Sequence, residues 1–213
     1  MADLYVAADS RQRAQSLLGN EIAFAEEILE GTRQFGSPDQ IHAASAGCLQ
    51  LRDRAAQIDL LGRPAPDLEA VEWLHGTPTT LVAQRGRVVV LEFWAPWCRS
   101  CTALFPYFRE LHVRYAAQGL TILALTNFRN HEGAEPPDQR ARDRELIRHA
   151  VDEHAVDFAV GIAPDERLRA RYGANGIPTF AVIDRDGYVQ LSSSKPDKSA
   201  LEGLITHLLE PGE

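Results

Sequence analysis

The first 60 residues carry two stripes of apolar positions that recur at spacings of three and four. This spacing places each stripe on one face of an amphipathic helix. The first stripe consists of Leu18, Ile22, Ala25 and Leu29, and the second of Ile41, Ala44, Cys48, Leu51, Ala55 and Ile58. Gly31 and Gly36 end the first stripe, and Ser37-Pro38-Asp39-Gln40 is typical of a helix start. The pattern predicts an antiparallel helical hairpin, whose stripes must be buried on each other, on the rest of the chain or on a second chain.

Beyond this segment, short apolar runs alternate with amphipathic stretches. A proline-rich connection over 61–67 marks the predicted boundary between a helical hairpin at 1–61 and a domain at 62–213. The expected strands cover 68–73, 88–93, 120–125, 158–160, 180–183 and 188–191. The expected helices cover 98–118, with a kink at Pro106, and then 139–154, 165–172 and 199–209. This alternation predicts an α/β fold, with a parallel-containing sheet covered on both faces and an antiparallel hairpin near its end.

Composition and charge narrow the range of functions. Of the 213 residues, 45% are hydrophobic and 24% are charged, which is ordinary for a globular chain that buries its own core. The formal net charge of −8 gives no electrostatic support for nucleic-acid binding. No apolar run approaches the roughly 20 residues that cross a membrane. The start of the sequence, Met1 to Tyr5, lacks the basic and apolar regions of a signal peptide, so a cytoplasmic location is expected.

The strongest chemical signal is the stretch Trp94-Ala95-Pro96-Trp97-Cys98-Arg99-Ser100-Cys101, between an apolar strand and a predicted helix. Two cysteines at this spacing can close a disulfide on the first helical turn, where the helix N-terminus favours a thiolate. A zinc site would need a second pair of ligands at a suitable spacing, and c-type haem attachment would need a histidine where Thr102 stands. We therefore predict a redox site without a metal or cofactor, in preference to a structural disulfide.

Residues near the cysteine pair suggest how its chemistry is tuned. Glu92 is a carboxyl in a strand that is otherwise apolar, so burial should raise its pKa and suit it to accept a proton from Cys101. The alternative is that Glu92 lies at the strand end and pairs with a cation. Arg99 places a positive charge beside Cys98, which favours the thiolate. Cys48 lies on the second apolar stripe and is expected to fill the core rather than to act as a third redox thiol.

The motif Trp-Ala-Pro-Trp-Cys-x-x-Cys after an apolar strand, with Gly176-Ile177-Pro178-Thr179 before a later strand, resembles the thioredoxin superfamily. The extra strand and turn before the core and the inserted helix at 139–154 are most similar to its TlpA/ResA-like (redoxin) branch. The resemblance covers about residues 62–210 and implies a thioredoxin-like fold. Two features depart from the branch: the dipeptide Arg99-Ser100 is not one of the common variants, and Leu104 stands where a glutamate is frequent.

The resemblance also implies roles for individual residues. Cys98 would be the nucleophile and Cys101 the resolving cysteine. Pro178 would be a cis-proline that faces the disulfide, with the Ile177 backbone turned toward an extended substrate chain. Glu92 occupies the position of the buried acid of the superfamily.

Together these features predict a thiol-disulfide oxidoreductase that reduces protein or small-molecule disulfides and is recharged by a thiol electron donor. Its substrate would contact Trp97, Arg99 and Ile177. Two alternatives remain open. One is a thiol peroxidase, a class that shares the fold, and the other is a redox-gated adaptor that works through the N-terminal hairpin. The apolar stripes of the hairpin also predict a homodimer.

Overall fold

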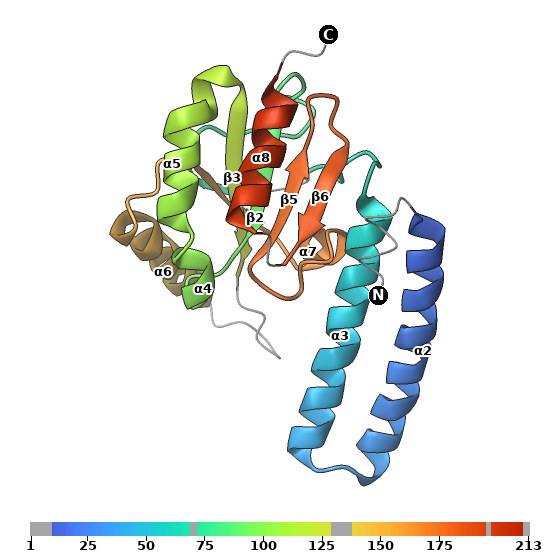
Figure 1. Cartoon of the computed structure of the whole chain (residues 1–213). Coiled ribbons are helices and arrows are strands. Elements are labelled where there is room, and N and C mark those ends of the chain that lie inside the picture. Colours follow the sequence, from blue (N-terminus) through green and yellow to red (C-terminus); the bar gives the residue numbers. More distant parts are fainter. Residues whose placement is uncertain (1–9, 69–71, 129–137, 195–196, 211–213) are drawn as a thin grey trace.

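The computed structural model describes residues 10–68, 72–128, 138–194 and 197–210 (Figure 1). Its centre is a six-stranded sheet in the order β1-β4-β3-β2-β5-β6. The strands are β1 (Glu72–His75), β2 (Val88–Phe93), β3 (Leu120–Asn127), β4 (Ala159–Ala163), β5 (Thr179–Ile183) and β6 (Val189–Ser193). Strands β2, β3 and β4 are parallel, whereas β1, β5 and β6 pair antiparallel with their neighbours. The predicted mixed sheet with a parallel centre is therefore confirmed.

Helices cover both faces of this sheet, as predicted. The described helices are α2 (Arg11–Phe35), α3 (Pro38–Leu60), α4 (Arg99–Thr102), α5 (Phe105–Tyr115), α6 (Gln139–Glu153), α7 (Arg167–Arg171) and α8 (Lys198–Leu209), with a 3-10 turn η1 (Ala116–Gln118). Side chains of α5, α6 and α8 build the larger apolar cluster on one face. Side chains of α7 and the last residue of α3 pack into a second cluster on the other face.

Strand β2 lies in the middle of the sheet and is buried along its whole length. Its side chains alternate between the two faces, as the pleat requires. Val88 and Val90 join the larger cluster, while Val89, Leu91 and Phe93 join the smaller one. A strand that is apolar on both faces is typical of the interior of a parallel sheet, because helices cover both of its sides.

The two N-terminal helices form the predicted hairpin, which extends away from the sheet (Figure 1). Ser37 caps α3 in a capping box, in which its hydroxyl accepts a hydrogen bond from Gln40 N and its own N–H donates to Gln40 Oε1. Helix α2 continues through Gly31 and ends before Gly36. The expectation of a break at Gly31 is therefore wrong. One glycine in a helix interior costs only about 1 kcal/mol, and the hydrogen bonds of the other turns keep this long helix intact.

The prediction of a single helix over 98–118 is also wrong, because two helices occupy this stretch. Helix α4 ends at Thr102, and α5 begins at Phe105 with Pro106 in its first turn. The proline has no N–H to donate to the carbonyl of Thr102, four residues earlier, and its ring would clash with that carbonyl. The chain therefore breaks where only a kink was expected, and the four-residue α4 carries the cysteine pair separately from α5.

Smaller differences concern the ends of strands. The first strand of the domain was predicted at 68–73 and is found at Glu72–His75, while residues 69–71 lie outside the described part. Strand β4 runs on to Ala163, beyond the predicted end at residue 160. Pairing with β3 extends it, since Leu125, Thr126 and Asn127 lie opposite its last three residues.

The second half of α3 packs against the domain through polar contacts. Gln57 Nε2 donates to Gly173 O at 2.7 Å, and Arg54 Nη1 donates to Ser192 O at 3.3 Å. Gly173 has a φ of +58°, and a Cβ added there would lie 2.3 Å from Asp53 O. Glycine is therefore required at this position both by its backbone conformation and by the close approach of α3. The domain boundary after residue 61 stays a prediction.

The close approach of α3 can be tested with Gly173→Ala, because the added methyl group collides with the α3 backbone. Gly86→Ala is the matched control, since Gly86 also has a positive φ, +85°, but has nothing within 4 Å of an added Cβ. We expect Gly173→Ala to lower the free energy of unfolding by about 1–3 kcal/mol more than the control does. Urea unfolding of both variants measures this difference, and equal losses would contradict the observed packing.

Candidate active site

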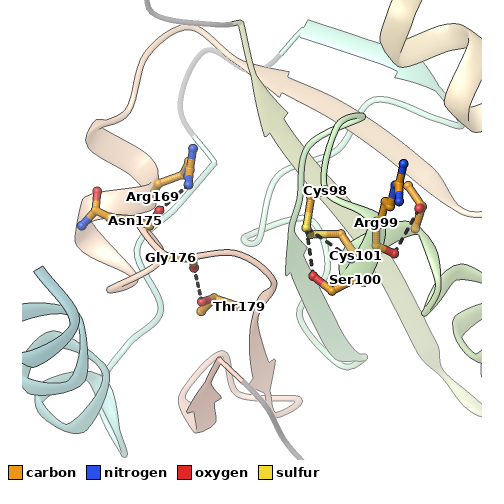
Figure 2. Close-up of a disulfide and its surroundings, with 9 residues drawn as sticks. Cys98, Arg99, Ser100, Cys101, Arg169, Asn175, Gly176 and Thr179 are labelled. Atoms are coloured by element: carbon orange, nitrogen blue, oxygen red, sulfur yellow. Dashed lines mark hydrogen bonds between the residues drawn. A yellow bond between two sulfur atoms is a disulfide. The ribbon is translucent and has the colours of Figure 1, made fainter. Parts of the chain in front are cut away.

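Cys98 and Cys101 form a disulfide at the start of α4, just beyond the carboxyl end of β2. Cys98 is the N-cap residue of this helix, and its Sγ accepts a hydrogen bond from Cys101 N at 3.2 Å. The Ser100 hydroxyl lies 3.4 Å from the same sulfur (Figure 2). Cys98 is half-buried and Cys101 is fully buried. Only Cys98 is open to an incoming disulfide.

The two tryptophans of the motif have different surroundings. Trp94 is fully buried and packs edge-on against Phe105, with ring centroids 4.9 Å apart. Trp97 leaves 53% of its surface exposed directly before Cys98. Arg99 is exposed on the other side of Cys98. Trp97 and Arg99, both predicted to contact the substrate, therefore lie at the rim of the site.

Glu92 is completely buried, and its carboxyl lies on the same face of the sheet as Cys101. The alternation along β2 turns Glu92 toward the larger apolar cluster, which contains Cys101 and also Ala124 and Phe180, the cross-strand neighbours of Glu92. Neither carboxyl oxygen has a hydrogen-bond partner among the described residues, so the alternative of a cation pair at the strand end is wrong. Burial raises the pKa of Glu92 well above its ordinary value of 4.5.

Two further buried polar groups accompany Glu92. The indole N–H of Trp94 and the hydroxyl of Thr126 also have no hydrogen-bond partner within the described ranges. Thr126 follows Ile122 and Ala124 on the side of β3 that faces the larger cluster. Buried polar groups without partners are rare and each requires an explanation. Here they lie on the face that carries the redox pair, where a proton must be exchanged.

The loop before β5 brings the second sequence motif to this site. The Ile177–Pro178 peptide is cis, as predicted. Thr179, the next residue, lies opposite Phe93 at the end of β2, and its hydroxyl donates to Gly176 O at 2.6 Å (Figure 2). Ile177 is half-buried and packs against the same apolar cluster as Cys98. The fold thus places the loop 176–178, which we call the proline loop, beside the disulfide.

Two residues that no sequence motif predicted, Arg169 and Asp53, hold the segment 174–176 that leads into this loop. The guanidinium of Arg169 donates to Ala174 O at 3.0 Å, to Asn175 O at 2.7 Å and to Asn127 Oδ1 at 3.0 Å. Burial lowers the pKa of this guanidinium below its ordinary value. Asp53 of α3 accepts hydrogen bonds from Asn175 Nδ2 at 2.6 Å and from Gly176 N at 2.9 Å. No local pattern identifies Asp53, because its partners lie more than 120 residues away in the sequence.

A family model described as the AhpC/TSA family matches residues 61–192, which is more than half of the chain and excludes the hairpin. The chain belongs to the AhpC/TSA family. One relative is the thiol-disulfide oxidoreductase ResA of Bacillus thuringiensis (strain Al Hakam), which is 29% identical over 146 residues, 68% of this chain and 76% of ResA. Another is the thioredoxin-like protein YneN of Bacillus subtilis (strain 168), 28% identical over 129 residues, 61% of this chain and 68% of YneN.

Solved structures show the same relationship. A crystal structure from Chlorobium tepidum, assigned as a thiol:disulfide interchange protein DsbE, is 30% identical with a TM-score of 0.55 and covers 70% of this chain and 98% of its own. A solution structure from Bacteroides thetaiotaomicron, at 22% identity and a TM-score of 0.56, supports the fold alone. The thioredoxin-like fold and the resemblance to the ResA-like branch are therefore confirmed.

Other classes of site do not appear in the part of the chain that the structure describes. Within it, no group of three or more His, Cys, Asp or Glu side chains comes close enough together to hold a metal ion. None of the described helices combines the length and apolar character that crossing a membrane requires.

Cys48, the third cysteine, is buried and unpaired on α3. Ala14, Leu18 and Ile58 form a small apolar core in the hairpin.

The unpartnered carboxyl of Glu92 predicts an unusual dependence of stability on pH. Because its pKa is higher in the folded protein than in the unfolded chain, its contribution to stability is complete below about 4.5 and is lost as the pH rises toward the folded-state pKa. In the oxidised protein, Glu92→Gln should abolish this loss. The variant should gain stability over the wild type with rising pH, by about 1.4 kcal/mol for each unit of the pKa shift.

Urea unfolding at a series of pH values measures this gain. Glu110→Gln, which removes an exposed carboxyl of α5, is the control and should leave the profile parallel to that of the wild type. A Glu92→Gln profile that is also parallel to the wild type would contradict the assignment of a raised pKa.

Proposed function

We propose that this protein is a thiol-disulfide oxidoreductase, like its relatives named ResA. The proposal rests on the position of the Cys98–Cys101 disulfide, which lies just beyond the carboxyl end of the central strand and beside the proline loop. One sulfur of the pair is accessible and the other is buried. This asymmetry distinguishes a cysteine that attacks an external disulfide from one that resolves the product.

In the first step, the Cys98 thiolate attacks one sulfur of a substrate disulfide. The substrate S–S bond breaks, its second sulfur leaves as a thiolate that takes up a proton, and a mixed disulfide to Cys98 forms. The N–H of Cys101 donates to Cys98 Sγ, and a hydrogen bond of this kind stabilises negative charge on that sulfur. The exposed guanidinium of Arg99 adds a positive charge to the same rim.

In the second step, Cys101 attacks Cys98 Sγ and the substrate leaves as its second thiol. Two electrons have then passed to the substrate, and the Cys98–Cys101 disulfide is restored. Cys101 must lose its proton in a buried site, and ionised Glu92 on the same face is the proposed acceptor. In the recharging direction, protonated Glu92 returns a proton to Cys101 as a thiol donor opens the disulfide. A raised pKa suits both directions, because it makes the ionised carboxyl a stronger base and the protonated carboxyl a form that is easier to retain in the core.

The direction and setting of the reaction are also part of the proposal. We place the protein in the cytoplasm, where a thiol donor would keep the pair reduced and the enzyme would act as a reductase of protein disulfides. The proposed substrate contacts are Trp97, Arg99 and Ile177 at the rim of the site.

Of the alternatives, the interaction module has an observation in its favour. Phe24, Ile28 and Phe35 on α2 expose 62%, 49% and 90% of their surfaces along the hairpin. Such an apolar face supports the proposed homodimer through the N-terminal helices, which would accompany the redox activity rather than replace it. No feature of the described residues favours the thiol peroxidase over the oxidoreductase.

Insulin reduction by dithiothreitol tests the proposed reaction. We expect the wild type to accelerate it and Cys98→Ser to abolish the acceleration, because the attacking thiolate is lost. In the absence of dithiothreitol, reduced Cys101→Ser should carry out the first step but not the second, and should therefore accumulate a mixed disulfide between Cys98 and an insulin chain. Non-reducing mass spectrometry detects this adduct.

Cys48→Ser provides the control for loss of a thiol as such, because Cys48 is buried in the hairpin away from the pair. This variant should reduce insulin at the wild-type rate. Equal rates for the wild type and Cys98→Ser would refute the oxidoreductase.

A further inference from the structure

A cavity of about 450 Å³ lies between α3 and the proline loop. Side chains of α3 form one wall, the residues 176–178 form the opposite wall, and Ser194 at the end of β6 completes it. Its volume is within the usual range for ligand pockets. Because the family match begins at residue 61, the α3 wall is a feature of this chain that the match does not include.

Hydrogen bonds join the two walls of the cavity into one unit. The carboxylate of Asp53 is buried and uses both oxygens on the loop side, one for the side chain of Asn175 and one for the N–H of Gly176. Gln57 Nε2 donates both to Gly173 O, at 2.7 Å, and to Ser194 Oγ, at 3.3 Å. The hairpin thus positions the residues that precede the cis-proline, and the cavity has a defined shape.

The cavity borders the proline loop, which also belongs to the redox site. Ile177 and Pro178 line it, and Ile177 also packs against the apolar cluster that Cys98 contacts. Among the described residues, no backbone hydrogen bond engages the N–H or C=O of Ile177. Both groups can therefore pair with an extended chain that runs from the disulfide into the cavity.

The chemistry of the walls favours a peptide main chain. Gln50, Gln57 and Ser194 offer neutral hydrogen-bond donors and acceptors. The charges of Asp53 and Arg54 offset each other, so the walls present neither a cationic nor an anionic site. An anionic small disulfide gains little from such a surface, whereas uncharged peptide groups can be satisfied along it.

We propose that α3 and the proline loop form a subsite for the polypeptide segment that flanks the disulfide of a protein substrate. The inference rests on the proposed oxidoreductase function and adds to it a recognition element built from the N-terminal hairpin. Cys98 would hold the substrate covalently while its neighbouring residues lie along Ile177 and enter the cavity past Gln50.

Photocrosslinking from α3 tests the subsite in the full chain. In the Cys101→Ser background, the photoreactive residue p-benzoylphenylalanine replaces Gln50 in one protein and Arg52 in another, and each is trapped as the mixed disulfide with insulin. Gln50 is exposed at the mouth of the cavity. Arg52 lies about 200° further around the helix, where it pairs with Glu26 of α2. This ion pair is exposed, so losing it has little effect on the fold.

After irradiation and reduction of the mixed disulfide, we expect insulin to remain attached at position 50 with a yield several-fold above that at position 52. A trapped mixed disulfide with equal or no crosslinking from position 50 would overturn the subsite and leave the oxidoreductase intact. If no mixed disulfide forms in either protein, the oxidoreductase itself is refuted, and the subsite with it.

Discussion

The burial of β2 between β3 and β5 is the constraint on which the active site depends. Every side chain of this strand is enclosed, so its carboxyl end is held by two neighbouring strands and by helices on both faces. The cysteine pair follows directly, and β5 brings the proline loop to the same end because Thr179 pairs with Phe93. The same burial removes Glu92 from water without giving it a partner in the described structure, and its altered proton affinity follows from that.

The site is also held from outside the central strand. Arg169 of α7 and Asp53 of α3 both form hydrogen bonds with the residues before the cis-proline. The hairpin is therefore tied to the domain through the loop closest to the redox chemistry. Its far end remains separate, with an apolar face along α2. One appended element thus combines an anchored end, which shapes the site, with an exposed end suited to a second chain.

Local patterns in the sequence were sufficient for much of this arrangement. The apolar stripes predicted both helices of the hairpin, the continuous apolar run predicted β2, and the spacing of Cys98 and Cys101 predicted the redox pair. Other features depend on contacts that no local pattern carries. The break at 103–104 results from the carbonyl of Thr102 meeting Pro106, and a helix stripe alone does not show how far that distortion spreads. Asp53 resembles any polar residue of an amphipathic helix until folding brings Asn175 to it.

In the proposed mechanism, a carboxyl enclosed by the core serves the cysteine pair because burial has changed its affinity for protons. The most direct test is an NMR titration of the Glu92 side-chain carboxyl in the oxidised protein, with Glu92→Gln used to assign the resonance. We expect a midpoint well above the ordinary 4.5. A midpoint at or below 4.5 would show that Glu92 is ionised throughout the physiological range, and it would contradict the role assigned to this residue.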